Sequence, residues 1–496
     1  MSAPAVDYND IQGLLRFAHG KLTEACFWLL NIRDAAAARS WLAMAPVTTA
    51  IELDGPPKTA LHVAFTHEGF QALGLPEDIL AGFSDEFLAG MTEESRSRRL
   101  GDVGASAPQY WQWGGPGKVP HVLVMLYAQP SQLESWTENL QDAQWNAAFT
   151  VLACLPTSDL RNQEPFGFAD GISQPSLDWD RRRSPGGDQL TYTNLLTLGE
   201  FLLGYPNEYG KYTDRPLLDS GLPSSSILPF AEDVTHKRDL GRNGSYLVLR
   251  QLQQDVRGFW RFLDKQADSN AQARQDLAEH MVGRRMNGDP LLPSNTQPIE
   301  GIDPKTTAQN QFTYDSDAAG TRCPFGAHIR RANPRNADLP AGSNGLIGKL
   351  LHTLGFGSKK FRDDIMASTR FHRLLRRGRE YGPDLPPEQA LADSPDPGEH
   401  GIHFICLAAN ISRQFEFVQN AWVMTTKFNA MTEESDPLLG NRQPVPGCPF
   451  TDTFSIPQEA GVRTRITGLP QFITVRGGAY FFLPSLSALR YLAALR

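Results

Sequence analysis

A strand followed directly by a helix occurs twice in this sequence, and this repeat constrains the fold more than any other feature. An apolar run at 25–32 leads into an alanine-rich, helix-favouring segment at 33–45. A second apolar run at 245–252 leads into 255–263, where Asp255 is placed to cap a helix. Both halves then add short strands and amphipathic helices. The ferredoxin-like order is strand, helix, strand, strand, helix, strand. The sequence therefore predicts an α+β fold of two tandem ferredoxin-like units, with antiparallel sheets flanked by helices.

The other periodic segments fit the same plan. Further strands are expected at 61–65, 121–128, 147–155, 402–407, 472–476 and 480–483, and further helices at 69–75, 132–140, 413–423 and 485–495. The join between the units falls in 177–244, where Pro-Gly-Gly at 185–187 and three serines at 224–226 indicate connecting loops. The predicted domains are therefore an N-terminal one at 1–176 and a C-terminal one at 245–496.

Composition and charge narrow the classes of function. The 496 residues suffice for two or three domains, and a hydrophobic content of 41% is that of a globular protein with a full core. A formal net charge of −8 argues against a nucleic-acid-binding surface. The five cysteines form no CxxC pair, so neither a disulfide framework nor a zinc ribbon is indicated. No apolar run is long enough for a membrane span, and no signal peptide or twin-arginine pair is seen, so a cytoplasmic location is predicted.

The segment 323–335 holds one histidine among small and apolar neighbours, followed by three arginines. Pro334 disfavours a helix that continues beyond the residue before it. The imidazole of His328 can make an axial bond to haem iron, and the guanidinium groups of Arg330 and Arg335 can pair with the two haem propionates. A single histidine is more often a hydrogen-bonded structural or surface residue than an iron ligand, so His328 taken alone is a weak signal.

A second stretch places one carboxylate between two glycines, at Asp170 within 164–175. Because Asp-Gly is common turn chemistry, a turn alone would account for this residue. The sequence contains Gly-Phe-Ala-Asp-Gly at 167–171 and, downstream, Cys-Pro-Phe-Gly-Ala-His-Ile-Arg-Arg-Ala-Asn-Pro-Arg. This combination resembles the dye-decolorising peroxidases, which are haem enzymes with a GxxDG loop and a proximal-histidine segment of this form. The resemblance extends from an Asp-Ile-Gln-Gly opening at 10–13 to the last predicted helix at 485–495.

The resemblance implies the duplicated fold of the dimeric α+β barrel type, with haem b (iron protoporphyrin IX) held mainly by the C-terminal half. It implies a hydrogen-peroxide-dependent oxidoreductase of the EC 1.11.1 class, which oxidises dye-like or phenolic donors by one-electron steps through an oxyferryl intermediate. His328 would be the proximal iron ligand. Asp170 would be the distal acid–base that moves a proton between the two peroxide oxygens, and a nearby arginine would keep its pKa low.

The distal arginine comes from the same resemblance. The segment 374–382 matches the family's distal-arginine segment, and its register selects Arg376 as the distal charge stabiliser, although 379–380 depart from the commoner version. Without the resemblance, the simplest interpretation of Arg373, Arg376 and Arg377 is the basic face of a helix.

Three more residues are expected to contact the cofactor or its ligand. Alternation in the strand at 401–407 puts Ile402 and Phe404 on one face, and in the family such a pair narrows access to the distal side of the haem. The resemblance gives Asp436 the role of hydrogen-bond acceptor for the proximal imidazole. Ordinary core packing for the first two residues, and an Asp-Pro turn for Asp436, remain open.

Two alternatives to a peroxidase are also consistent with the sequence. One is a haem-binding protein with another role, such as iron release from haem or storage. The other is a ferredoxin-like binding module without catalysis, and the joint presence of His328, Asp170 and Arg376 speaks against it. The expected partners are hydrogen peroxide and small aromatic reductants, with no nucleic acid and no membrane span. A homodimer is kept as a candidate assembly.

Overall fold

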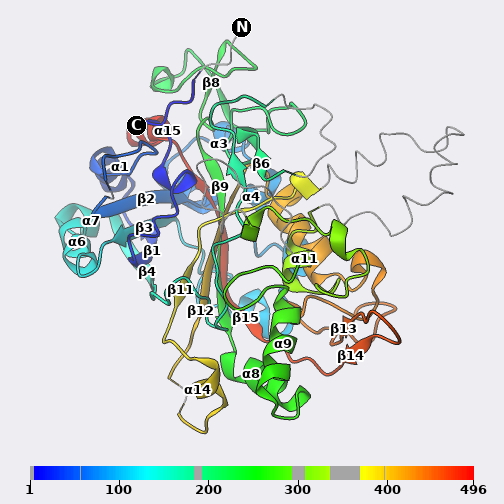
Figure 1. Cartoon of the computed structure of the whole chain (residues 1–496). Coiled ribbons are helices and arrows are strands. Elements are labelled where there is room, and N and C mark those ends of the chain that lie inside the picture. Colours follow the sequence, from blue (N-terminus) through cyan, green and yellow to red (C-terminus); the bar gives the residue numbers. More distant parts are fainter. Residues whose placement is uncertain are drawn as a thin grey trace, which may run out of the picture.

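The computed structural model describes residues 5–55, 57–183, 193–292, 308–335, 369–395 and 397–495. Their main feature is a nine-stranded sheet in the order β10-β12-β9-β15-β2-β3-β1-β4, with β11 also paired to β12 (Figure 1). The N-terminal half contributes β1 (Glu24–Ile32), β2 (Thr59–Phe65), β3 (Val122–Ala128) and β4 (Phe149–Pro156). The C-terminal half contributes β9 (Ser245–Gln254), β10 (Leu375–Arg376), β11 (Arg379–Tyr381), β12 (Gly401–Ala408) and β15 (Ile473–Leu483).

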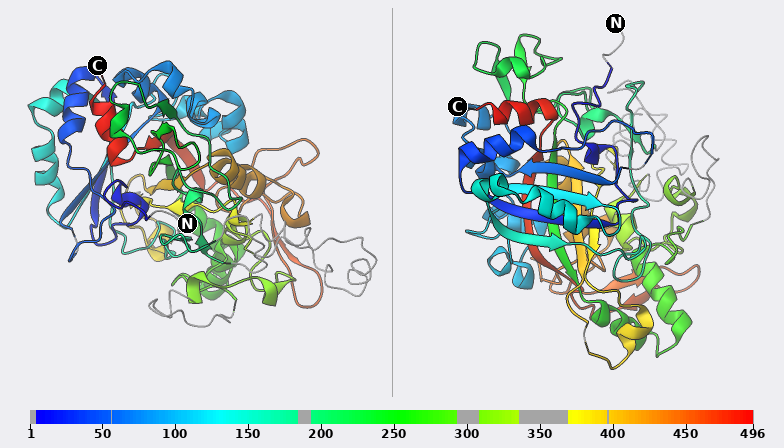
Figure 2. Two further views of the ribbon diagram at one scale, coloured as in Figure 1. Left: turned by 90° about the horizontal axis from the view of Figure 1, so that it is seen from above. Right: turned by 90° about the vertical axis from the view of Figure 1, so that its left-hand side faces the viewer.

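Both halves have the same strand order. The order is β2-β3-β1-β4 in the first half and β10-β12-β9-β15 in the second, where β10 and β11 count together as one strand. In each half the second strand in sequence therefore comes first, followed by the third, the first and the fourth. The predicted tandem ferredoxin-like architecture is therefore confirmed. The halves do not form separate sheets, however, because β15 of the second pairs with β2 of the first at Phe482 and Phe65. This pairing covers two strand edges that would otherwise be exposed. Figure 2 shows the two groups of strands running in different directions.

Helices follow the first strand of each half, as the repeat predicts. They are α1 (Ala35–Met44) and α8 (Val256–Gln266). The carboxylate of Asp255 accepts the N–H of Gly258, so α8 has the expected N-cap. The carboxylate of Asp34 accepts the N–H of Ala37 and caps α1 in the same way. Other helices near the sheet are α2 (His67–Leu73), α6 (Leu133–Leu140), α7 (Ala143–Ala148), α9 (Ala271–Val282) and α15 (Leu486–Ala493).

Two expected elements differ from the structure. The segments 472–476 and 480–483 belong to one long strand, β15, whose register shifts between Val475 and Gly477. The indole of Trp113 fills the place that a side chain at Gly477 would need, because a Cβ there would lie 2.5 Å from the ring. The segment 413–423, expected as an ordinary helix, has the wider π-helical hydrogen bonding at Ser412–Glu416 and Val418–Met424.

The segment 177–244 is irregular where it is described, as expected for connecting loops. It holds short strands and turns, with β5 (Ser176–Leu177), β6 (Leu195–Leu196), β7 (Leu217–Asp219) and β8 (Lys237–Asp239). The division into domains at 1–176 and 245–496 stays a prediction, since one sheet continues across both halves.

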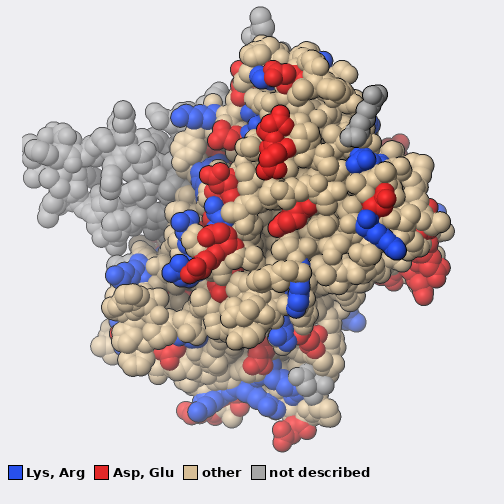
Figure 3. Space-filling view, turned by 180° about the vertical axis from the view of Figure 1, so that it is seen from behind, with Lys and Arg blue, Asp and Glu red and all other residues tan. Residues whose placement is uncertain are grey.

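The surface carries charges of both signs. Figure 3 shows acidic and basic side chains interspersed over the face seen from behind. Among the helices of the described ranges, none combines the length and the apolar character that crossing a membrane requires.

Candidate active site

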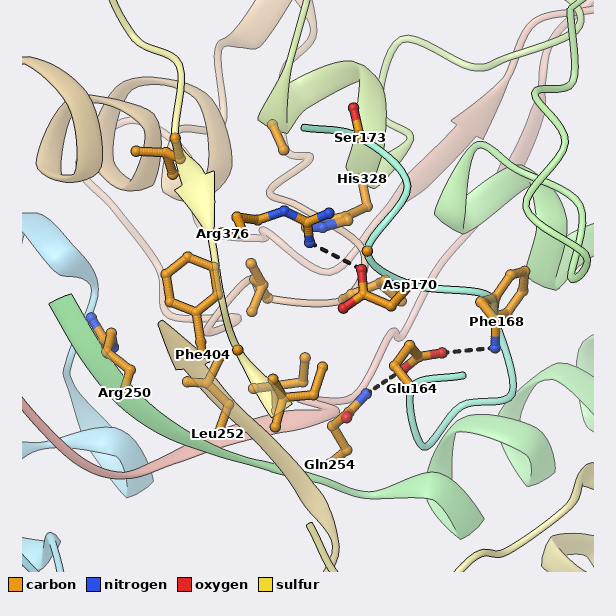
Figure 4. A pocket seen from close by; sticks show the side chains of 18 of the residues that line it. Glu164, Phe168, Asp170, Ser173, Arg250, Leu252, Gln254, His328, Arg376 and Phe404 are labelled. Carbon is orange, nitrogen blue, oxygen red and sulfur yellow. Dashed lines mark hydrogen bonds and ion pairs between the residues drawn. The ribbon is translucent and has the colours of Figure 1, made fainter. Parts of the chain in front are cut away.

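A cavity of about 580 Å³ lies at the C-terminal half of the sheet. Its walls come from the loop after β4, from strands β9, β10 and β12, and from helix α11 (His328–Ala332). Figure 4 shows side chains from these elements pointing toward one space. Segments far apart in the chain therefore build the site.

One wall is a two-strand surface. In β12, Ile402 and Phe404 line the cavity, and their antiparallel partners in β9 are Leu252 and Arg250, which line it too. Alternation along the strand explains why the residues at 402 and 404 share this face. This placement supports the expectation that the two side chains lie beside a cofactor.

Asp170 and Arg376 form an ion pair at the cavity, with 3.1 Å between Arg376 Nη1 and Asp170 Oδ1. Both side chains are about one third exposed, at 32% and 31%, so the pair is open to a ligand. Burial opposes ionisation of Asp170. The charge of Arg376 and the N–H of Gly171 outweigh burial and lower the pKa of this carboxyl below its ordinary value. Asp170 is thus ready to accept a proton at neutral pH.

The loop that carries Asp170 is held by Glu164, which the sequence did not single out. Its carboxylate accepts the backbone N–H groups of Phe166 and Phe168 and, at 2.7 Å, the side-chain amide of Gln254. Burial raises the pKa of Glu164 to about 7. A glutamate whose partners are N–H groups two and four residues ahead has no distinctive sequence signature, which is why it was missed.

His328 is the first residue of α11, and this short helix ends before Pro334, as expected. The imidazole Nδ1 lies 2.9 Å from Oδ2 of Asp436, a fully buried residue. The other oxygen of Asp436 accepts the N–H groups of Leu438 and Leu439, which fixes the carboxylate. An ionised Asp436 requires the proton on Nδ1, so Nε2 of His328 keeps its lone pair for a ligand in the cavity.

The electrostatics of this pair agree with that tautomer. Burial favours a neutral carboxyl, but the charge and the hydrogen bond of His328 lower the pKa of Asp436 below its usual value. Burial likewise disfavours the imidazolium, and Asp436 outweighs it and raises the pKa of His328. The carboxylate therefore increases the basicity of the ring that faces the cavity.

Arg284 is a second residue that sequence reasoning missed. Its Nη1 donates to the carbonyl oxygens of Gly288 and Gln309, whereas its Nη2 is buried with no hydrogen-bond partner among the described residues. The side chain lines the cavity, and burial, together with the nearby Arg335, lowers its pKa to about 10. A buried cation with an unused donor is suited to a carboxylate of a ligand.

The two arginines expected at the propionates do not line the cavity. Arg330 is 2% exposed, and its Nη1 lies 3.0 Å from Oδ2 of Asp317, so its charge already has a buried partner. Arg335 donates to two backbone carbonyls and, at 3.4 Å, to Ser173 Oγ, which does line the cavity. The role expected of Arg330 has no support in the described part of the chain, and that of Arg335 stays a prediction.

The arrangement has the parts that peroxide activation needs. An imidazole with a free, basic nitrogen, an ionised carboxylate and a guanidinium face one cavity, which also has an apolar wall. The unused Nη2 of Arg284 and the free Nε2 of His328 fit the carboxylates and the iron of a haem.

Known proteins resemble this chain over nearly its whole length. The dye-decolorizing peroxidase msp1 of Mycetinis scorodonius is 29% identical, with 99% of this chain and 88% of that protein covered. The multifunctional dye peroxidase DyP2 of an Amycolatopsis strain is 32% identical over 463 residues, with 87% and 82% covered. A scan against protein-family models found no match.

Solved structures agree with these relatives. An ancestral D-type dye-decolorizing peroxidase superposes with a TM-score of 0.71 at 25% identity, over 99% of this chain and all of that one. The DyP-type peroxidase of an Anabaena species superposes with a TM-score of 0.69 at 23% identity, over 98% and 94%. Another dye-decolorizing peroxidase, with a TM-score of 0.70 at 24% identity over 99% and 100%, has been solved in complex with 2,6-dimethoxyphenol.

Proposed function

This chain belongs to the dye-decolorising peroxidase family, and from that premise we propose that its cavity holds haem b and that His328, Asp170 and Arg376 carry the reaction with hydrogen peroxide. Membership makes the protein a haem-dependent oxidoreductase that uses hydrogen peroxide. One observation carries the residue assignment: Asp170 and Arg376, 206 positions apart in the chain, form an ion pair in the cavity that His328 also lines.

Each of the three side chains has a separate task. Haem, when bound, would supply the iron that reacts with peroxide. His328 would hold that iron through Nε2, while Asp436 fixes the ring and increases its basicity. Ionised Asp170 takes the proton from one peroxide oxygen and returns it to the other, which leaves as water. Arg376 keeps Asp170 ionised and stabilises the negative charge that develops on the departing oxygen.

The cofactor is held by contacts that the sequence predicted only in part. We assign Ile402 and Phe404 to the apolar wall against the porphyrin, where they also narrow access from the distal side. Arg284 takes the propionate role first expected of Arg330, because its Nη2 is buried and has no other hydrogen-bond partner among the described residues. Arg335 remains a candidate for the second propionate, because its guanidinium donates to Oγ of Ser173, which lines the cavity.

The proposed donors are small phenols and dye-like aromatics, and assays of donor oxidation test this directly. The haem-loaded protein is mixed with hydrogen peroxide and either 2,6-dimethoxyphenol or an anthraquinone dye. The proposal predicts peroxide-dependent oxidation of both donors over many turnovers. Bleaching of the haem with release of iron and no donor oxidation would favour an iron-release role instead. A homodimer and a cytoplasmic location stay predictions.

Replacing Asp436 with asparagine tests the buried partner of the proximal imidazole. Asparagine keeps an acceptor oxygen for the N–H groups of Leu438 and Leu439 but cannot accept the proton of His328 through its amide nitrogen. We expect activity or haem affinity to fall by about 10–100-fold and the iron reduction potential to become more positive, because the ring is less basic. An exposed carboxylate, changed in Asp315→Asn, is the control. An unchanged potential in the Asp436→Asn variant would contradict the role.

Replacing Arg284 with methionine tests the propionate contact. A hydrogen bond to a charged group contributes about 1.5–3 kcal/mol, so we expect haem to bind roughly 10–100-fold more weakly in titrations of the apoprotein. Haem dimethyl ester, which lacks both carboxylates, should bind both proteins equally. The neighbouring Arg285, whose side chain is 61% exposed, gives the matched control Arg285→Met. A loss of equal size for haem and its ester would mean that Arg284 acts only in folding.

A further inference from the structure

Two of the five cysteines lie on neighbouring strands. Cys26 belongs to β1 and Cys154 to β4, the strand at one end of the sheet order. Cys26 is opposite Pro156, and Trp28 is opposite Cys154. Directly opposed residues share a face, and so do residues two apart on one strand. The two cysteines are therefore diagonal neighbours on the same face of the sheet.

The two thiols interact, in a place where Cys26 is 6% exposed and Cys154 is open to solvent. The neighbouring thiol of Cys26 lowers the pKa of the Cys154 thiol, although burial opposes this. The same interaction, reinforced by burial, raises the pKa of Cys26. The exposed sulfur is thus the one that becomes a thiolate, with a protonated thiol beside it.

The other cysteines lack this combination. Cys323, Cys406 and Cys448 are buried. Burial raises the pKa of Cys323 to about 12 and also raises that of Cys406, which suppresses the reactive thiolate. They serve as internal controls for thiol oxidation in the same protein.

We propose that Cys26 and Cys154 are a dithiol oxidation site at which hydrogen peroxide closes a disulfide between β1 and β4. The Cys154 thiolate attacks one oxygen of peroxide, the O–O bond breaks, and a sulfenic acid and hydroxide form. The sulfur of Cys26 then attacks Cys154, the S–O bond breaks, and the second oxygen leaves as water with the thiol proton. In sum, two thiols and one peroxide give one disulfide and two waters.

The oxidant is the enzyme's own substrate, so the site is exposed to peroxide whenever the enzyme is. To form the disulfide, the two sulfurs must approach to an S–S distance of about 2.05 Å. Among the described strands β4 pairs only with β1, and a strand with one such neighbour can make this adjustment more easily than a central strand. The disulfide would fasten β4 just before the loop whose residues Ser158 and Asp159 line the cavity.

Peptide mapping tests the proposal on the haem-loaded protein. The protein is treated with hydrogen peroxide without a donor, free thiols are alkylated, and the digest is analysed without reduction. We expect a peptide pair joined through Cys26 and Cys154, formed at least about tenfold faster than any change at Cys323, Cys406 or Cys448. In a Cys26→Ser variant, dimedone should label Cys154. In a Cys154→Ser variant, Cys26 should stay reduced.

A second oxidant tests whether the two thiols can form a disulfide at all, separately from whether peroxide oxidises them. Diamide forms disulfides from adjacent thiols without peroxide chemistry, and it should close the same pair. A pair closed by diamide but left reduced by peroxide would overturn the proposal. So would oxidation of Cys154 to a sulfinic acid without a link, or a link between two protein molecules. The Soret band and far-UV circular dichroism of both serine variants should match the wild type, which shows that the fold is retained.

Discussion

Replacing Asp170 with asparagine is expected to slow the reaction with hydrogen peroxide by about 10²–10⁴-fold, the usual contribution of a positioned acid–base group. Asparagine has nearly the same size, and its carbonyl oxygen can still accept the hydrogen bond that Arg376 donates at 3.1 Å. It cannot take up the proton of peroxide. The change therefore removes proton transfer and leaves the shape of the cavity nearly intact.

Stopped-flow mixing of haem-loaded protein with peroxide measures this step separately from donor oxidation. Asp159 lines the same cavity, so Asp159→Asn is the matched control and should react at the wild-type rate. Haem affinity should be unchanged in both variants, because neither residue is assigned to the cofactor. Equal rates in Asp170→Asn and the wild type would remove Asp170 from the mechanism.

Replacing Arg376 with leucine should lower the rate with peroxide by about 10²–10³-fold, the typical effect of losing one group that stabilises developing negative charge. It should also change the pH dependence. Asp170 acts as a base only when ionised, so activity is present above its pKa and is lost as the pH falls through it. Arg376 lowers that pKa against the effect of burial. Without Arg376 the pKa rises, and the acid limb of the rate profile should move to higher pH.

Two further variants make this test specific. Arg376→Lys keeps a positive charge, so both the rate and the acid limb should fall between those of the wild type and the leucine variant. Arg161 lines the cavity too, is exposed, and serves as the control in Arg161→Leu. A slower leucine variant whose acid limb does not move would mean that Arg376 does not control the ionisation of Asp170.

Local patterns were enough to predict most of the fold. The cap at Asp255 and the alternation in β12 depend on neighbours in sequence, and the structure has both. The break in β15 was misread because Gly477 and Gly478 look like a turn. The small size of Gly477 instead makes room for Trp113, a residue more than 350 positions away, and no local pattern reveals such a contact.

The residues of the site also fall into some that local sequence patterns indicate and others that depend on distant contacts. His328, Asp170 and Arg376 occur in recognisable segments, so the sequence could indicate them. Arg330 occurs in one of these segments as well, but Asp317 binds its guanidinium in the core. Arg284 has no such segment around it. Whether an arginine faces the cavity or a buried carboxylate depends on tertiary packing, which spacing along the chain does not encode.

The most direct test of the central claim is the absorption spectrum of haem-loaded wild type and His328→Ala, before and after one equivalent of hydrogen peroxide. His372 also lines the cavity, and its Nδ1 is hydrogen-bonded to the carbonyl oxygen of Arg413. Because it is a second histidine at the same cavity, His372→Ala is the control. We expect a Soret band that peroxide shifts in the wild type and the control, and a band that is altered or lost in His328→Ala. An identical Soret band and peroxide response in His328→Ala would contradict it.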